Sequence, residues 1–259
     1  MLVMGCGTVF AAPAMDQASH EGTIKTFLPM AAYAGKNIEC PLTSDREYAL
    51  TPVIPPAETR PDYLHADLNL SLRGYEQTSA YLGLVTYSGA TDWDPPQLAH
   101  LFVDERIPQF TATYRVHDWN WSCDTNGCPG PLLDDWFVTL VSMQTSQGEP
   151  IRIPSRRAQI NATREQALVL YAEERRITLG YTAEDSVAFG YAVHIEDVCI
   201  DPNLLALYRL ANEEGRVRLP TLGNDQILGM AAGESIGVSV RDRGTFMDPR
   251  SRKDWWIVQ

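Results

Sequence analysis

Four of the five cysteines, those other than Cys6, limit the ways in which this chain can fold. They lie at positions 40, 123, 128 and 199, and an even number of cysteines in an exported chain favours disulfides. Cys123 and Cys128 enclose a short loop whose Asn-Gly pair suits a tight turn, so we expect them to pair. Cys40 then remains for Cys199, a bridge that would tie the N-terminal segment to the C-terminal region. The alternative, a structural zinc site, would require a second closely spaced cysteine pair.

Strand and turn patterns outnumber helical patterns along the chain. Apolar and polar residues alternate at 63–72 and 110–116, which predicts strands there, and we expect a further strand at 81–87. Residues 28–62 are rich in proline, which predicts an extended segment lying across a surface. These patterns indicate a mostly β protein.

One helix is expected, from Asp201 to Glu214. Asp201 can cap it, Pro202 suits its first position, and Gly215 can end it. Residues 97–102 could add one or two helical turns.

Composition excludes several classes of partner. The chain has 259 residues, with 33 acidic and 21 basic side chains and a formal net charge of −12. Without a run of Lys or Arg, nucleic acid and anionic membrane surfaces are not expected partners. No stretch after the N-terminal residues approaches the roughly 20 apolar residues of a membrane span, so no transmembrane segment is expected.

Two strings near the C-terminus carry a resemblance to a known family. Residues 223–229 read Gly-Asn-Asp-Gln-Ile-Leu-Gly, and residues 233–249 run from Gly-Glu-Ser-Ile-Gly-Val-Ser-Val-Arg to Met-Asp-Pro. They resemble the last hairpin of the lysostaphin-type zinc endopeptidases, which cut bacterial cell-wall peptides. In that family a His-x-His pair there supplies a zinc ligand and a catalytic histidine. Ser235 and Gly237 occupy those positions in this chain.

The resemblance extends upstream: residues 148–154 resemble a strand of the family, 167–179 its next hairpin and 190–195 a further strand. It covers about 110 residues in all, from near Val138 to Pro249. The family's first zinc-binding His and Asp would fall near Val138 and Ser142, so only His194 remains from the usual set. The resemblance therefore implies an antiparallel β-sheet or sandwich domain with one inserted helix, and without a metal or other cofactor.

The sequence patterns and the family resemblance together divide the chain into three expected parts. Residues 1–27 resemble the remnant of an export signal, with a small-x-small cleavage pattern at 12–14, and Cys6 offers a lipoprotein site as the alternative. Residues 28–135 would form the proline-rich segment and a small β region with the disulfide loop. Residues 136–259 would form the degenerate lysostaphin-type domain.

Several residues are candidates for binding. His65 and Asp67 would share one face of a strand, and together with His194 they could offer a His-Asp-His zinc set, although such a pair is more often the solvent face of an edge strand. The family resemblance places residues 194–197, with His194 and Glu196, along the cleft that corresponds to the peptidase active site. Tyr191 lies in the same resembling strand and is a further candidate.

A second group of candidates is aromatic. His117, Trp119 and Trp121 lie just before the expected disulfide loop, and Trp93 is nearby in sequence. Such side chains can stack on sugar rings or bind a peptide. Alternatively, Trp119 and Trp121 share one face of a strand and could both be buried.

The sequence favours a secreted or cell-surface protein that binds cell-wall peptide, glycan or an envelope protein without catalysis. One alternative is a zinc-dependent hydrolase with ligands drawn from His65, Asp67, His117 and His194. A third hypothesis is a structural protein that assembles with copies of itself.

Overall fold

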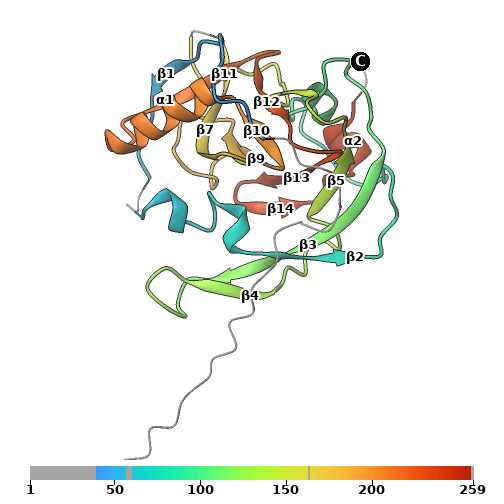
Figure 1. Cartoon of the computed structure of the whole chain (residues 1–259). Coiled ribbons are helices and arrows are strands. Elements are labelled where there is room, and N and C mark those ends of the chain that lie inside the picture. The colour runs from blue at the N-terminus through green and yellow to red at the C-terminus, as the bar shows by residue number, and fades with distance from the viewer. Residues whose placement is uncertain (1–38, 57–59, 163, 258–259) are drawn as a thin grey trace, which may run out of the picture.

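The computed structural model describes residues 39–56, 60–162 and 164–257, and this part of the chain is mostly β (Figure 1). Eleven of its strands form one antiparallel sheet, and three form a smaller one. The main path of the large sheet runs β1 (Ala49–Pro52), β11 (Arg218–Gly223), β7 (Glu165–Glu173), β8 (Arg176–Gly180), β9 (Tyr191–Glu196), β13 (Ser235–Asp242), β5 (Leu140–Gln144), β3 (Phe110–Asn120) and β2 (Tyr75–Thr78). Beside this path, β14 (Thr245–Met247) pairs with β13, and β4 (Cys128–Leu132) pairs with β3. The smaller sheet has the order β10 (Val198–Ile200), β12 (Ile227–Ala231) and β6 (Pro150–Arg152). The expected mostly β, antiparallel fold is confirmed.

The large sheet crosses the expected domain boundary near residue 135. Strand β3 lies before that boundary and pairs directly with β5, which lies after it. The edge strand β1 comes from the proline-rich segment and pairs with β11. The division of the chain at residue 135 stays a prediction, but hydrogen bonds join both parts into one sheet.

The strands expected upstream of the C-terminal strings are present. β6 lies within 148–154, β7 and β8 form the hairpin expected at 167–179, and β9 covers the strand expected at 190–195. The two C-terminal strings do not pair with each other, however. The first includes the start of β12, in the small sheet, and the second contains β13 and its hairpin partner β14.

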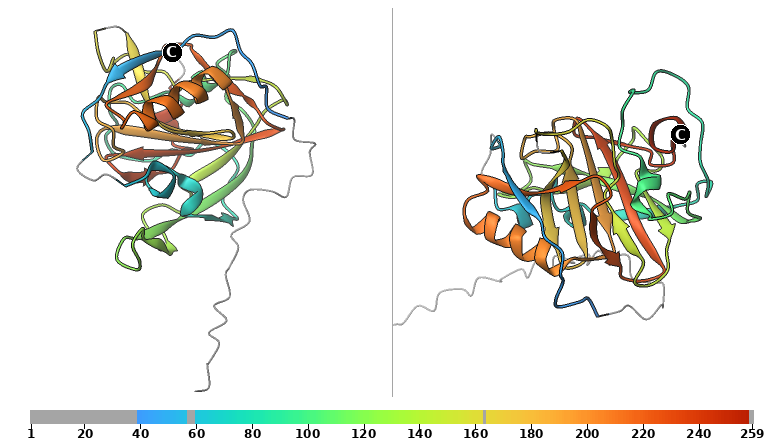
Figure 2. Two further views of the ribbon diagram at one scale, coloured as in Figure 1. Left: turned by 60° about the vertical axis from the view of Figure 1, so that its left-hand side comes forward. Right: turned by 90° about the horizontal axis from the view of Figure 1, so that it is seen from above.

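The expected helix is confirmed as α1 (Pro202–Glu213). The side chain of Asp201 accepts a hydrogen bond from the amide of Asn203, and Pro202 begins the helix. Gly215 follows the helix with a φ of 85°, a conformation that glycine adopts without strain. α1 packs against β7 and β11 (Figure 2). The shorter helices η3 (Leu98–Leu101) and α2 (Arg252–Trp255) lie elsewhere in the chain, and η3 confirms the helical turn expected at 97–102.

The strands expected at 63–72 and 81–87 are wrong. Residues 63–72 instead contain two 3₁₀ turns, η1 (Asp62–Leu64) and η2 (Leu70–Leu72). Side chains here bond the local backbone: the Asn69 carboxamide accepts from the Ser71 amide at 3.2 Å. Such bonds compete with a strand ladder, and they outweigh the period-two alternation of leucines that predicted a strand. Residues 81–87 form only an isolated bridge, from Val85 to Ser251.

Both expected disulfides are present, Cys40–Cys199 and Cys123–Cys128. The first joins the chain before β1 to β10, and the second closes the tip of the hairpin formed by β3 and β4. Cys6 and the proposed export signal lie outside the described residues.

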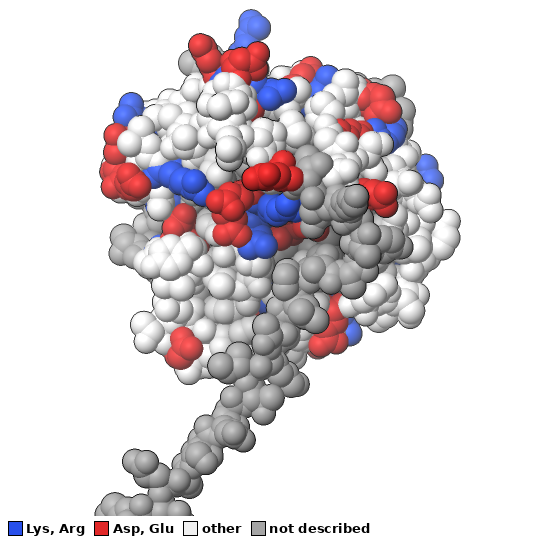
Figure 3. All heavy atoms as spheres, in the orientation of Figure 1, with Lys and Arg blue, Asp and Glu red and all other residues white. Residues whose placement is uncertain are grey.

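The main core combines apolar side chains from both sheets, from α1 and from α2. Within the described ranges, no helix is long and apolar enough to cross a membrane. On the face drawn in Figure 3, Lys and Arg side chains are interspersed with Asp and Glu and form no continuous basic band.

Candidate functional site

The middle of the large sheet carries a row of polar side chains on one face. Thr178 on β8, His194 on β9 and Ser239 on β13 are direct neighbours in the strand register, and all three are buried. Residues two apart on a strand share a face, so Glu196 and Arg241 also lie on this face. Buried polar groups of this number must find hydrogen-bond partners inside the protein.

Residues 61–73, which we call the covering segment, supply many of these partners. The Thr178 hydroxyl donates to the carbonyl oxygen of Leu68 at 2.6 Å, and the Arg176 guanidinium donates to Ser71 Oγ at 2.9 Å. Residues 67–73 of the segment thus lie against the polar face, with contacts to Thr178, Arg176 and Arg241. The segment therefore seals this face of the sheet from solvent.

His194 is held as a neutral imidazole. Its Nδ1 lies 2.8 Å from Thr178 Oγ1, whose single proton is already donated to Leu68. Nδ1 must therefore carry a proton and donate it, which leaves Nε2 as an acceptor. Nε2 is buried without a hydrogen-bond partner among the described residues. Burial, together with the positive charges of Arg241 and Arg73, lowers the pKa of His194 well below its ordinary value.

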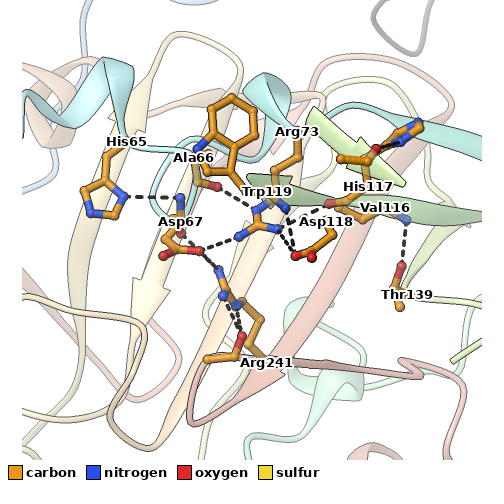
Figure 4. Close-up of polar contacts among 12 residues, drawn as sticks. His65, Ala66, Asp67, Arg73, Val116, His117, Asp118, Trp119, Thr139 and Arg241 are labelled. Atoms are coloured by element: carbon orange, nitrogen blue, oxygen red, sulfur yellow. Dashed lines mark hydrogen bonds and ion pairs between the residues drawn. The ribbon is translucent and has the colours of Figure 1, made fainter. Parts of the chain in front are cut away.

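On the same polar face, one carboxylate joins two buried arginines (Figure 4). Asp67 Oδ1 accepts from Arg73 at 2.6 Å and from Arg241 at 2.9 Å. We call Arg73, Asp67 and Arg241 the Arg–Asp–Arg cluster. Burial opposes the ionisation of Asp67, but the guanidinium groups of Arg241 and Arg73 outweigh it and hold its pKa well below the usual range. Asp67 therefore remains a carboxylate at any pH near neutrality.

The two arginines are fixed by further contacts. Arg73 donates to the carbonyl oxygens of Ala66 and His117, and Arg241 donates to that of Gly244. Burial lowers the pKa of Arg241 to about 10. The negative charge of Asp67 acts against this shift, and the positive charge of Arg73 adds to it. The two guanidinium groups outnumber the one carboxylate, so the cluster exerts a net positive influence on His194.

A second ion pair lies further along the same face. Arg176 donates to Glu196 Oε2 at 2.9 Å, and Glu196 is 5% exposed. Burial raises the pKa of Glu196 to about 7, against the opposing charge of Arg176. His194 and Glu196 are thus packed inside the protein and do not line an open cleft, contrary to the expectation from the family resemblance.

The arrangement around His194 is unsuited to a metal ion. No group of three or more His, Cys, Asp or Glu side chains in the described ranges could hold one. The alternative set of His65, Asp67 and His194 does not form in the described residues, where Asp67 is bound to two arginines. The guanidinium charges also oppose a cation at this position.

An open cleft lies on the other side of the covering segment. Its volume is about 720 Å³, within the range of small-molecule sites. Its walls come from the proline-rich and covering segments, the loop between β8 and β9, the end of α1, and the disulfide hairpin. His65, Asp67 and Trp121 all line it, so the structure brings three of the expected binding residues together.

Aromatic side chains line this cleft. Tyr63 is 59% exposed and Trp121 is 39% exposed. The His65 ring meets the Trp121 ring edge-on, with centroids 5.2 Å apart. The Arg60 guanidinium lies 4.6 Å from the centre of the Trp121 ring and donates to the carbonyl oxygen of Thr125 at 3.3 Å. These contacts hold the tip of the hairpin against the cleft.

His117 and Trp119 brace the hairpin. His117 Nδ1 lies 2.8 Å from the carbonyl oxygen of Gly130 on β4. Trp119 is buried, and its indole nitrogen donates to the carbonyl oxygen of Asn126 at 3.2 Å. The expectation that both tryptophans could be buried holds for Trp119 and fails for Trp121, which lies just beyond the end of β3.

The remaining candidates lie apart from the cleft. Tyr191 sits on the opposite face of β9 from His194, and its hydroxyl donates to Asp92 Oδ2 at 2.9 Å. Trp93 is 73% exposed and lines a separate cavity with His100 and Arg157. Neither residue contributes to the site around His65 and Trp121.

Sequence reasoning missed Arg73, Arg241 and Tyr63. One signal was available for Arg241, which follows alternating valines at 238 and 240 in a strand. A charged residue inside such a strand indicates a buried partner of opposite charge. The partner itself, Asp67, lies 174 residues away and could not be identified from spacing.

Comparisons of the chain with protein families, with curated proteins and with solved structures give no match.

Proposed function

We propose that this protein is a non-catalytic binding protein of the bacterial cell envelope, secreted or held at the cell surface, on a lysostaphin-type scaffold that has lost its metal site. The two disulfides support an oxidising compartment outside the cytoplasm. The family and the envelope ligand rest on the resemblance of the sequence strings described above.

The observation that carries the proposal is the contrast between the two sides of the covering segment. On one side, the face that bears His194 is sealed, and the positive charges of Arg241 and Arg73 disfavour a protonated imidazole there. A hydrolytic zinc site needs about three protein ligands and an open position for water. On the other side, the cleft of His65 and Trp121 is open and aromatic. The geometry thus favours binding over hydrolysis.

A co-sedimentation experiment with purified cell-wall sacculi tests this function. The protein should be retained on sacculi, and no soluble peptide or sugar fragments should be released during long incubation. Trp121→Ala should weaken retention because it removes an aromatic wall of the cleft, whereas Phe137→Ala should not, because Phe137 is exposed elsewhere. Release of fragments would support a hydrolase. Failure of the wild-type protein to sediment would contradict an envelope ligand.

A further inference from the structure

The charges at the base of the cleft are already paired within the protein. Arg216 makes two bonds to the carboxylate of Asp185, at 2.7 and 2.5 Å. It also donates to the Tyr208 hydroxyl and the Asn212 carboxamide, each at 3.0 Å. Asp62 in turn accepts from Tyr208 and Asn212. This base therefore offers no uncompensated charge to a phosphate, a carboxylate or an ammonium group.

The backbone around the cleft is unsuited to an extended peptide. The amide of Ile54 donates to Ala183, and the amide of Asp185 donates to the carbonyl oxygen of Ile54, so this edge is already paired. The adjoining wall contains Pro55, Pro56 and Pro61, which have no backbone N–H. A peptide strand added here would find few main-chain partners.

What the cleft does offer is flat aromatic surface beside one fixed acceptor. Tyr63 and Trp121 are partly exposed on its walls. Asp67 also lines it with a side chain that is 22% exposed, and both of its arginine contacts use Oδ1. Oδ2 is therefore available to a hydroxyl donor, while Arg73 and Arg241 fix the orientation of the carboxylate. Flat apolar faces and fixed hydrogen-bond acceptors are complementary to sugar rings, which carry C–H faces and hydroxyl edges.

We propose that the cleft binds a neutral oligosaccharide, with sugar rings packed on Trp121 and Tyr63 and a ring hydroxyl donated to Asp67. This inference rests on the proposed function, because it names the ligand class of the envelope-binding site. Arg73 and Arg241 act as positioning residues for Asp67.

Isothermal titration of the full chain tests this inference with three probes: the tetrasaccharides of β-1,4-linked N-acetylglucosamine and of β-1,4-linked glucose, and the neutral tetrapeptide Ala-Glu-Lys-Ala. At least one sugar should bind, and the peptide should not. Trp121→Ala and Tyr63→Ala should each weaken sugar binding roughly tenfold, the upper range for one aromatic contact. Phe137→Ala is the control. Tyr63 is more than half exposed, so its variant keeps the test valid if Trp121→Ala disturbs the hairpin.

The outcomes separate the ligand class from the envelope role. Peptide binding without sugar binding would overturn the inference but leave envelope binding intact. Sugar binding that is lost in the Trp121 and Tyr63 variants, without retention on sacculi, would support the glycan site and contradict the envelope role. Sugar binding that both variants retain would overturn the inference, and so would binding of none of the probes.

Discussion

At Glu196, burial and a neighbouring charge oppose each other. The carboxyl group is almost inaccessible, and its partner Arg176 also lies within reach of Glu173 and Ser71. Burial prevails and raises the pKa of Glu196 to about 7, above the ordinary value of 4.5. The folded protein therefore holds this proton more tightly than the unfolded chain does.

This raised pKa predicts a pH dependence of stability. The contribution of Glu196 is fully present below its unfolded pKa and is lost as pH rises through its folded pKa. Between pH 4.5 and about 7 the wild type should lose stability relative to Glu196→Gln, by up to about 3 kcal/mol. Urea unfolding of both proteins at several pH values measures this difference. Parallel stability curves would show that Glu196 titrates normally.

At the scale of elements, the covering segment and β13 are joined mainly through Asp67. The two arginines of the Arg–Asp–Arg cluster are buried, with side chains 5% exposed. Removal of one partner from a buried ion cluster leaves uncompensated charge, which is more damaging than the loss of a surface pair. The carboxylate therefore secures the seal over the polar face of the sheet.

Asp67→Asn should lower the free energy of unfolding by roughly 3 kcal/mol or more, because two guanidinium groups would lose their counter-charge. Since the pKa of Asp67 is lowered, this difference should persist from pH 7 down to about pH 4 and diminish only in stronger acid. The matched control is Asp104→Asn, which breaks a surface contact with Arg106 and should change stability by less than about 1 kcal/mol. Equal effects of the two substitutions, measured by urea unfolding, would contradict the role of Asp67.

Elements with strong local signals could be predicted from the sequence. The caps around α1 and the alternation in β3 are encoded by neighbouring residues, and so is the tight loop between Cys123 and Cys128. The covering segment could not be predicted, because its leucines alternate with the period of a strand, whereas the chain there forms 3₁₀ turns. Its true conformation depends on side chains such as Asn69 and on partners across the fold.

The candidate site was only partly predictable for a related reason. His65, Asp67 and Trp121 were recognised as residues able to bind, and the fold brings them to one cleft. Their roles depend on residues distant in sequence: Arg241 fixes Asp67, and Arg60 packs on Trp121. Residue type therefore indicated which side chains could bind a ligand. The tertiary contacts decide which of these side chains is exposed in the cleft and which is buried.

At the scale of the whole molecule, the sheet ties distant parts of the chain together. Strands β1 and β11 pair at one edge, and Cys40 is linked to Cys199 across 159 residues. The covering segment then closes the polar face near the middle of the sheet. The protein thus presents one sealed, positively charged interior site and one open aromatic cleft.

The metal content of the protein, purified without chelator or affinity metal, tests the central claim most directly. Elemental analysis should find no stoichiometric zinc, and His194→Ala should leave the metal content unchanged, because His194 is buried and the positive charges of Arg241 and Arg73 act on it. Near-stoichiometric zinc that falls in His194→Ala would contradict this account and indicate a hydrolase.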